Sequence, residues 1–266
     1  QAKVGVALTA TIVALALIGP LLLPWATGYT ATEFADQPFR LTGPFGTDNL
    51  GRDVLSRFLS GGLTLITLAL LATAVGIIVG MIFGTVAAYT GGTVDSILMR
   101  ANDVLLAIPQ LVFALLAVTV LGPQGWVLVM VLGLTHAPRV ARVTRSAALN
   151  VINEDYIAAA EMYAVPRWRI IVREILPNIT GPLTVEAGLR LTYSIGGIAS
   201  LSFLGLGLQP PAPDWGLMIN ENRIALAVQP WGVMLPVLVI ALLTIGTNLI
   251  ADSIARTFAS TKVSEA

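Results

Sequence analysis

The residues of this chain whose types and spacing could most clearly take part in chemistry are two charged residues inside an otherwise apolar run. Glu186 and Arg190 are four residues apart, so on a helix they share one face and can form an ion pair. Ionisable groups inside spanning helices rarely face lipid, and usually face a cavity or each other. We therefore keep two interpretations open, a structural ion pair and a wall of a translocation path.

Other catalytic and cofactor-binding patterns are missing from the sequence. His136 is the only histidine and there is no cysteine, so we expect neither a metal cluster nor thiol chemistry. No G-x-x-x-x-G-K-[ST] phosphate loop occurs, and neither Lys3 nor Lys262 follows a glycine. We expect no cofactor in this chain and no enzymatic activity of its own. If ATP drives its function, ATP and Mg²⁺ must be bound by a partner.

The composition is that of an integral membrane protein. Of the 266 residues, 56% are hydrophobic and 11% are charged, and the mean hydropathy is +0.83. Soluble domains carry about 25% charged residues, and they cannot cover this much apolar surface. The formal net charge of zero argues against nucleic acid as a partner. The elements that position Glu186 and Arg190 are therefore expected to be helices in a bilayer.

Apolar runs long enough to span a bilayer predict an all-α fold with six transmembrane helices in one domain, residues 1–266. We expect these spans near residues 4–24, 62–90, 104–121, 126–149, 179–208 and 231–255. The first is interpreted as an uncleaved anchor rather than a signal peptide, and because the chain starts at Gln1 we expect a native segment before it. Gly76, Gly80 and Gly84 recur every four residues, a spacing that lets two membrane helices approach closely.

The distribution of basic residues between the loops predicts the orientation. Ten Lys and Arg residues fall on the side of both termini and of the 150–178 loop, and four fall on the opposite side. The positive-inside rule then makes both termini and the 150–178 loop cytoplasmic. Arg139, Arg142 and Arg145 recur every three residues, either as part of this positive-inside anchor or as contacts for a cytoplasmic partner.

The cytoplasmic loop 150–178 is predicted to form two short helices. Asn153 can cap a helix over 154–165, with Glu154 and Asp155 in its first turn. Pro166 closes this helix or starts the next, and WRIIVREIL has the pattern of a second amphipathic helix. An amphipathic helix pair of this kind can lie on lipid or place its apolar face in a groove of another protein.

Two polar motifs on the opposite side are predicted to be structured. In TDNLGRD, Thr47 or Asp48 can cap a helix that begins near Asn49. This motif is interpreted either as a lid packed on the helices or as a surface that receives a binding protein. The segment QPPAPDWG is stiffened by its prolines, and Trp215 is interpreted as an anchor at the membrane interface.

Three stretches resemble a known family. AAAEMYAVPRWRIIVREILPN at 158–178 resembles the cytoplasmic coupling loop of ABC importer permeases, whose pattern has Glu and Gly where this chain has Ala158 and Ala164. GPFGTDNLGRDVLSR at 43–57 and SLSFLGLGLQPPAPDWGLM at 200–218 resemble signatures of the C-type permease subunit of the dipeptide/oligopeptide permease family. With the six expected spans, the resemblance covers essentially the whole chain.

The resemblance implies the type I ABC importer permease fold, in the inner membrane of a bacterium. It implies a heterodimer with a B-type permease, two ATP-binding subunits on the cytoplasmic side and an extracytoplasmic substrate-binding protein. Relatives handle dipeptides, longer peptides, nickel, glutathione or haem. Arg52 and Asp53 are the expected contacts of the binding protein. The residues expected to couple to the ATPases are Tyr156, Ala159, Ala160, Met162, Tyr163 and Arg167.

Two other functions can be distinguished from that of an ATP-driven permease subunit. A self-sufficient secondary transporter would use Glu186 and Arg190 for proton coupling, but the sequence shows no repeated half of the kind such transporters often carry. An intramembrane enzyme would need a carboxylate pair, a Ser/His couple or a metal cluster within the spans, and we find none. The favoured hypothesis is the permease subunit of an ATP-driven peptide importer.

Overall fold

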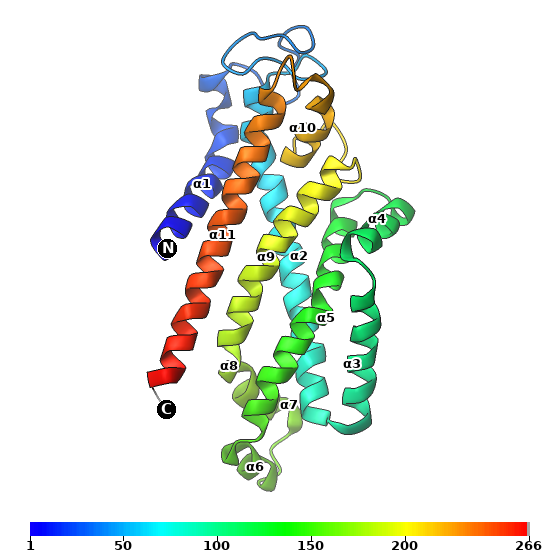
Figure 1. The fold of residues 1–266 in the computed structure, drawn as a ribbon, viewed down its shortest axis with the longest axis vertical. Helices are drawn as coiled ribbons and strands as arrows, with labels where there is room; N and C mark the ends of the chain where they lie inside the picture. Colours follow the sequence, from blue (N-terminus) through cyan, green and yellow to red (C-terminus); the bar gives the residue numbers. More distant parts are fainter. Residues whose placement is uncertain (265–266) are drawn as a thin grey trace.

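Long apolar runs of the sequence form long helices that lie along one axis of the molecule (Figure 1). The structure is a computed structural model that describes residues 1–264. The long helices are α1 (Ala2–Ala26), α2 (Val54–Thr90), α5 (Gly125–Ile152), α9 (Thr180–Phe203) and α11 (Trp231–Ser264). Within the described residues no strand forms, and only two isolated β-bridges occur, both in the 27–53 loop region and its junction with α2. The expected all-α membrane fold is confirmed.

The number of spans is less clear-cut than the expected six. By length and apolar character, α1, α2, α5 and α11 can each cross a membrane, and the bent pair α3 (Gly92–Ala107) and α4 (Gln110–Leu121) can supply a fifth span. The remaining long helix, α9, corresponds to the predicted span 179–208 but is more polar, because it contains Glu186 and Arg190. The count of six therefore stays a prediction.

The residues of the predicted span 104–121 do not form one straight helix. The chain is already helical from Gly92, and the helix breaks between α3 and α4 with a bend of 84°. Pro109 explains the break, because proline disfavours helical backbone in the residue before it. Ile108 is indeed extended, with φ −85° and ψ 124°. Apolar character continues across this point, so hydropathy alone does not reveal it.

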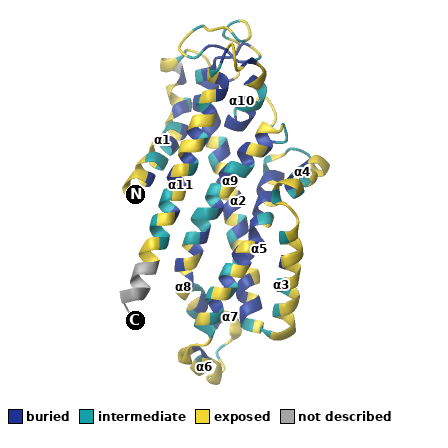
Figure 2. Ribbon diagram, viewed as in Figure 1, coloured by how far each residue is buried: buried dark blue, intermediate teal, exposed yellow. Residues whose placement is uncertain are grey.

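The glycine stripe of α2 packs against α5, as its spacing predicts. A Cβ on Gly80 would lie 2.5 Å from the Cβ of Val140, and one on Gly76 would lie 2.8 Å from the Cβ of His136. Real side chains do not approach so closely, so glycine is required for this helix contact. The faces of α2 and α5 that meet are buried, whereas α3 and α6 are largely exposed (Figure 2).

The start of α2 differs from the prediction. The helix begins at Val54, and the Asp53 side chain caps it by accepting a hydrogen bond from the Ser56 N–H at 2.7 Å. The expected cap at Thr47 or Asp48 is wrong, because Asp48 Oδ1 instead accepts from the backbone N–H groups of Leu50 and Arg52 in a turn. Asp48 is thereby fixed in the loop rather than in a helix.

Candidate functional site

The segment 150–178, which we call the coupling loop after the resemblance of its sequence, forms a compact series of short helices at the end of the bundle opposite the 27–53 loop (Figure 1). It contains α6 (Asp155–Met162), α7 (Arg167–Ile170), a π-helical turn (Ile171–Ile175) and α8 (Leu176–Asn178). The two predicted helices are present, although the first ends at Met162 rather than at 165. Pro166 is the N-cap of the second. Asn153 is not the cap of α6, because its Nδ2 group donates to the Leu149 carbonyl instead.

The turn between α6 and α7 is a Schellman motif with alanine in the glycine position. The Val165 N–H donates to the Ala160 carbonyl at 3.1 Å, and the Ala164 N–H donates to the Glu161 carbonyl at 2.9 Å. Ala164 has φ +53°, the left-handed region that glycine adopts without strain. The turn that a glycine would favour therefore forms here, with a cost to Ala164 of about 1 kcal/mol.

The inner face of the coupling loop is firmly tied to the long helices. Ile157, Ile170 and Ile175 are fully buried in one apolar cluster. The Tyr89 hydroxyl, near the end of α2, donates to Glu161 Oε1 of α6 at 2.7 Å. α6 is thus joined to α2 by the Tyr89–Glu161 hydrogen bond and to the buried cluster by Ile157.

Tyr156 belongs to the same attachment. Its hydroxyl accepts a hydrogen bond from Asn178 Nδ2 at 3.2 Å, which joins α6 to α8. Burial, followed by the negative charges of Glu154 and Glu174, raises the pKa of the Tyr156 hydroxyl. The hydroxyl therefore stays neutral at physiological pH, and the side chain is 43% exposed.

The outer face of the coupling loop exposes large apolar side chains beyond the end of the bundle. Met162 is 87% exposed, Tyr163 is 85% exposed and Trp168 is 61% exposed. Of the other residues predicted for coupling, Ala159 and Arg167 are exposed and Ala160 is half-buried. The sequence analysis missed Trp168 as an outward apolar residue and Ile157 as the inward one, although both lie in the amphipathic segment. Exposed apolar groups clustered on one loop are typical of a protein contact.

A closed ring of four buried charges lies at the opposite end of the bundle. Arg52 contacts Asp48 at 2.7 Å and Glu221 at 3.0 Å, while Arg57 contacts Glu221 at 2.9 Å and Asp48 at 3.3 Å. All four side chains are less than 10% exposed. The ring joins the 43–57 motif to α10 (Trp215–Asn222), so that the two polar motifs form one structure.

Further contacts lock this end of the molecule. Trp215 is fully buried, stacks on Phe58 and donates its indole N–H to the Phe58 carbonyl at 2.8 Å. Its prediction as an interface anchor is therefore wrong. Gln229 Nε2 donates to the Phe45 carbonyl at 2.6 Å. Arg52 and Asp53, predicted to contact a binding protein, are both turned inward in this chain, so they hold the surface in shape.

The interior contains the charged pair that the sequence singled out. Glu186 Oε1 and Arg190 Nε are 2.8 Å apart on α9 and both side chains are buried, so the predicted ion pair forms. The Arg190 guanidinium also lies over the Tyr193 ring, 4.9 Å from its centre. On the same helix, Ser194 Oγ lies 3.1 Å from His136 Nε2 of α5. Within residues 1–264 no group of acidic residues and histidine could hold a metal ion.

The three evenly spaced arginines of α5 all face the bent pair α3–α4. Arg145 makes two contacts of 2.5 Å with the Asp95 carboxylate, and Arg142 pairs with Asp103. Arg139 Nη1 donates instead to the neutral Gln110 Oε1 at 3.3 Å. These contacts fix α3 to α5, a role that the sequence analysis did not consider, and they leave Arg139 without an acidic partner.

Comparisons with known proteins point to one family. Residues 76–262 match the family described as "Binding-protein-dependent transport system inner membrane component". The chain is 33% identical, over 95% of its length and 83% of the relative's, to the dipeptide transport system permease protein DppC of Alkalihalophilus pseudofirmus. It is 30% identical, over 95% and 83% of the two chains, to the oligopeptide transport system permease protein OppC of Bacillus subtilis.

Solved structures agree on the fold. A chain of the MetNI methionine ABC transporter in an inward-facing conformation is similar with a TM-score of 0.57, at 16% identity, over 74% of this chain and 96% of that one. A chain of an amino acid ABC transporter crystallised with histidines is similar with a TM-score of 0.55, at 16% identity, over 76% and 94%. At this identity the similarity concerns the fold alone.

Proposed function

Because the chain belongs to the family of binding-protein-dependent transport system inner membrane components, we propose that it is the permease subunit of an ATP-driven importer of dipeptides or oligopeptides. The observation that carries this proposal is the coupling loop. Its outer face exposes Met162, Tyr163 and Trp168, its inner face is joined to α2 by Tyr89–Glu161, and within it α6 is joined to α8 by Tyr156–Asn178. Such a loop can receive a force from outside the chain and pass it to the bundle.

The proposal requires partners on both sides of the membrane. Two ATP-binding subunits, which would hold ATP and Mg²⁺, dock on the cytoplasmic side. One of them docks at the coupling loop of this chain, and the other docks on the second permease. A second, B-type permease completes the path, and a substrate-binding protein delivers the peptide from outside. The chain is a multi-pass protein of the inner membrane, and the positive-inside distribution supports a cytoplasmic position for both termini.

The transport step follows from how the coupling loop is attached. When the ATPases close on ATP, α6 moves with them, and the contacts Tyr89–Glu161 and Asn178–Tyr156 transmit the displacement to α2 and α8. The bundle then exchanges between inward-open and outward-open states. The energy for this two-state shift comes from the partner. A partner shifts the equilibrium between the inward-open and outward-open states only if it binds one state more tightly than the other.

The buried ring of charges supports a rigid platform for the binding protein. Arg52 and Asp53 do not offer free side chains in this chain, so we propose that they act indirectly: Arg52 holds the loop 43–57 against α10 through Glu221, and Asp53 caps the start of α2. The binding protein would then recognise the shape of this surface. Replacing either residue should weaken binding-protein stimulation without changing the residues that the binding protein touches.

Co-purification tests the proposal directly. The chain is expressed with its native neighbours, extracted in a mild detergent, and assayed for bound ATPase subunits and ATP-dependent peptide uptake in liposomes. We expect the ATPases to co-elute, and their retention to be lost when residues 154–165 are deleted while the second permease remains. A chain that purifies alone and moves peptide without ATP contradicts the proposal.

A second candidate, proton-coupled secondary transport, is favoured only by the buried Glu186–Arg190 pair. Proton coupling would require Glu186 to gain and lose a proton in each cycle. Glu186→Gln should then abolish uptake driven by a proton gradient. Under the ATP-driven proposal the same variant retains most ATP-dependent uptake and shows no response to a proton gradient, as does the unmodified protein.

A further inference from the structure

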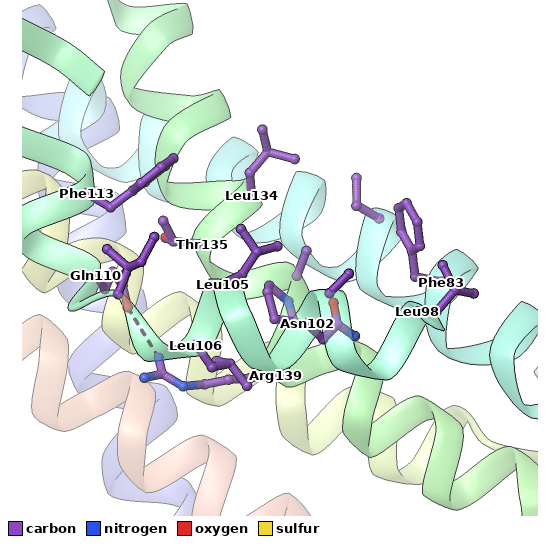
Figure 3. A pocket seen from close by; sticks show the side chains of 15 residues that line it. Phe83, Leu98, Asn102, Leu105, Leu106, Gln110, Phe113, Leu134, Thr135 and Arg139 are labelled. Atoms are coloured by element: carbon purple, nitrogen blue, oxygen red, sulfur yellow. Dashed lines mark hydrogen bonds between the residues drawn. The ribbon is translucent and has the colours of Figure 1, made fainter. Parts of the chain in front are cut away.

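An apolar cavity lies between α2, α3, α4 and α5, at the bend of the broken helix pair (Figure 3). Its volume is about 390 Å³, within the range of about 300–1,000 Å³ that is typical of small-molecule sites. Most of its wall is apolar, and the side chains of Phe83, Leu105 and Leu134 in this wall are also about half exposed. The cavity therefore opens on the surface of the bundle, where an apolar chain can enter it from the bilayer.

One polar side chain in the cavity wall has no partner. Asn102 of α3 is 9% exposed, and its Nδ2 group makes no hydrogen bond. Buried polar groups in native proteins are nearly always hydrogen-bonded, either within the protein or to another molecule. Asn102 therefore indicates that the occupant of the cavity carries a hydrogen-bond acceptor.

Arg139 lies at the edge of the cavity as an exposed cation without an acidic partner. Its guanidinium donates to the neutral Gln110 Oε1, and none of the ion pairs of residues 1–264 includes it (Figure 3). In contrast, Arg142 and Arg145 are each paired with an aspartate of α3. Together α3 and α5 contain four arginines and two aspartates, so the pair has an excess of positive charge.

Arg139 is level with the beginning of α1, where the first apolar run of the sequence starts. Three contacts cross the bundle at this level, from α1 through α11 and α9 to α5: Gly5–Gly246, Thr192–Thr247 and His136–Ser194. Arg139 follows three residues after the last of these contacts, toward the coupling loop. Basic residues near the end of a span, such as Lys3 here, extend to the lipid headgroups. The exposed Arg139 guanidinium therefore lies at headgroup level.

We propose that the cavity binds one anionic phospholipid of the cytoplasmic leaflet, with the lipid phosphate on Arg139. The Asn102 amide donates to a second headgroup oxygen, and an acyl chain occupies the apolar part of the cavity. Basic pockets between membrane helices on the cytoplasmic side are typical sites for such headgroups. The lipid fills the bend between α3 and α4 and holds the two halves of the broken helix pair in place.

A surface of the second permease is the alternative cover for this face. It would have to bring an acidic side chain to Arg139 at the level where the bilayer itself supplies phosphates. The excess positive charge, the headgroup level and the opening of the cavity on the bundle surface together favour the lipid. The site is independent of which substrate is transported.

The test is thermal unfolding of the complex that co-purifies with the chain, delipidated in detergent. It is titrated with phosphatidylglycerol, with phosphatidylcholine of the same acyl chains, or with inorganic phosphate. A ligand that binds only the folded state raises Tm according to its affinity. We expect phosphatidylglycerol to bind about five-fold more tightly than phosphatidylcholine, as for one basic residue acting on an anionic lipid, and inorganic phosphate to leave Tm unchanged.

The charge of Arg139 is tested by matched substitutions. Arg139→Gln should remove the preference for phosphatidylglycerol, and Arg139→Lys should keep most of it. Lys3→Gln is the control and should keep the preference, because it removes an exposed charge at the same level but from α1, on the far side of the bundle from α3 (Figure 1).

Asn102→Leu supplies an independent readout. If Asn102 binds nothing, replacing an unpaired buried amide by an apolar group of similar shape leaves lipid affinity unchanged and is neutral or stabilising for the fold. We instead expect the affinity for both phospholipids to fall several-fold, with the preference for phosphatidylglycerol kept.

Four results overturn the proposal. Equal affinity of the unmodified complex for the two phospholipids shows that the site does not select an anionic lipid. Equal effects of Arg139→Gln and Lys3→Gln show a general surface potential rather than a site. Loss of the second permease from the Arg139→Gln complex shows that a protein covers this face. Stabilisation by inorganic phosphate alone shows that the site takes a free anion.

Discussion

The buried ring of charges leads to a prediction that can be worked out from its geometry. Arg57 lies between two carboxylates, with Nη2 2.9 Å from Glu221 Oε2 and Nε 3.3 Å from Asp48 Oδ2. Replacing Arg57 by Met keeps most of its apolar stem and removes its charge. The ring then holds two carboxylates and only Arg52, so one buried negative charge is left uncompensated.

The expected loss of stability is about 3 kcal/mol, the lower end of the range for removing one partner of a buried ion pair. The lower end applies because Arg57 Nε and Nη1 make no well-aligned hydrogen bond in the ring. For a chain of this size the melting temperature should fall by roughly 6–12 °C. Adding Glu221→Gln removes the excess negative charge, because Asp48 and Arg52 remain paired at 2.7 Å.

The assay is thermal unfolding of the purified complex in detergent, measured for both single variants and the double variant. We expect the double variant to be less destabilised than the sum of the two single variants, with a coupling energy of about 1–3 kcal/mol. Additive effects, or an Arg57→Met variant within about 0.5 kcal/mol of the unmodified protein, would refute the reasoning that the ring is a coupled, desolvated network.

Three further changes test other parts of the fold. Ala164→Gly relieves the left-handed backbone at the α6–α7 turn, so amide exchange of α6 should slow about five-fold; unchanged or faster exchange contradicts the strain argument. Gly80→Leu should lower the thermal stability by about 1–3 kcal/mol or more, because its Cβ would meet Val140, whereas Gly196→Ala, which meets nothing within 4 Å, is the control; equal melting temperatures would contradict the close α2–α5 contact. Trp215→Phe removes the hydrogen bond to the Phe58 carbonyl and should destabilise the complex by about 1–3 kcal/mol in thermal unfolding; no change would mean that the bond contributes nothing.

The sequence was sufficient for features that depend on local pattern. The membrane class, the helices of the coupling loop, the Glu186–Arg190 pair and the glycine contact all follow from composition or from spacing along one helix. The break at Pro109 was also visible in the sequence, since proline disfavours helix in the residue before it. It was missed because the apolar run continues through it, and hydropathy does not register backbone geometry.

Features that join distant segments were beyond the reach of the sequence. Glu221 lies 164 residues from Arg57 and 169 from Arg52, and nothing in its own neighbourhood marks it as their partner. The burial of Trp215 similarly depends on its position against α2, which the sequence around it does not reveal. Asn102 and Arg139 line one cavity between four helices, and no single segment of the sequence reveals that they lie close together. Each of these residues is defined by tertiary contact rather than by local pattern.

The coupling of ATP hydrolysis to uptake through the exposed face of α6 is the central claim, and its most direct test is the ratio of ATP hydrolysed to peptide imported. Tyr163 is 85% exposed and contributes an apolar ring at the end of α6, so Tyr163→Asp places a charge in the expected contact without disturbing the buried cluster. In the reconstituted complex we predict that Tyr163→Asp abolishes ATP-dependent uptake while the second permease is retained. Tyr163→Phe, the matched control, should behave as the unmodified protein. Unchanged uptake per ATP in Tyr163→Asp would contradict the account.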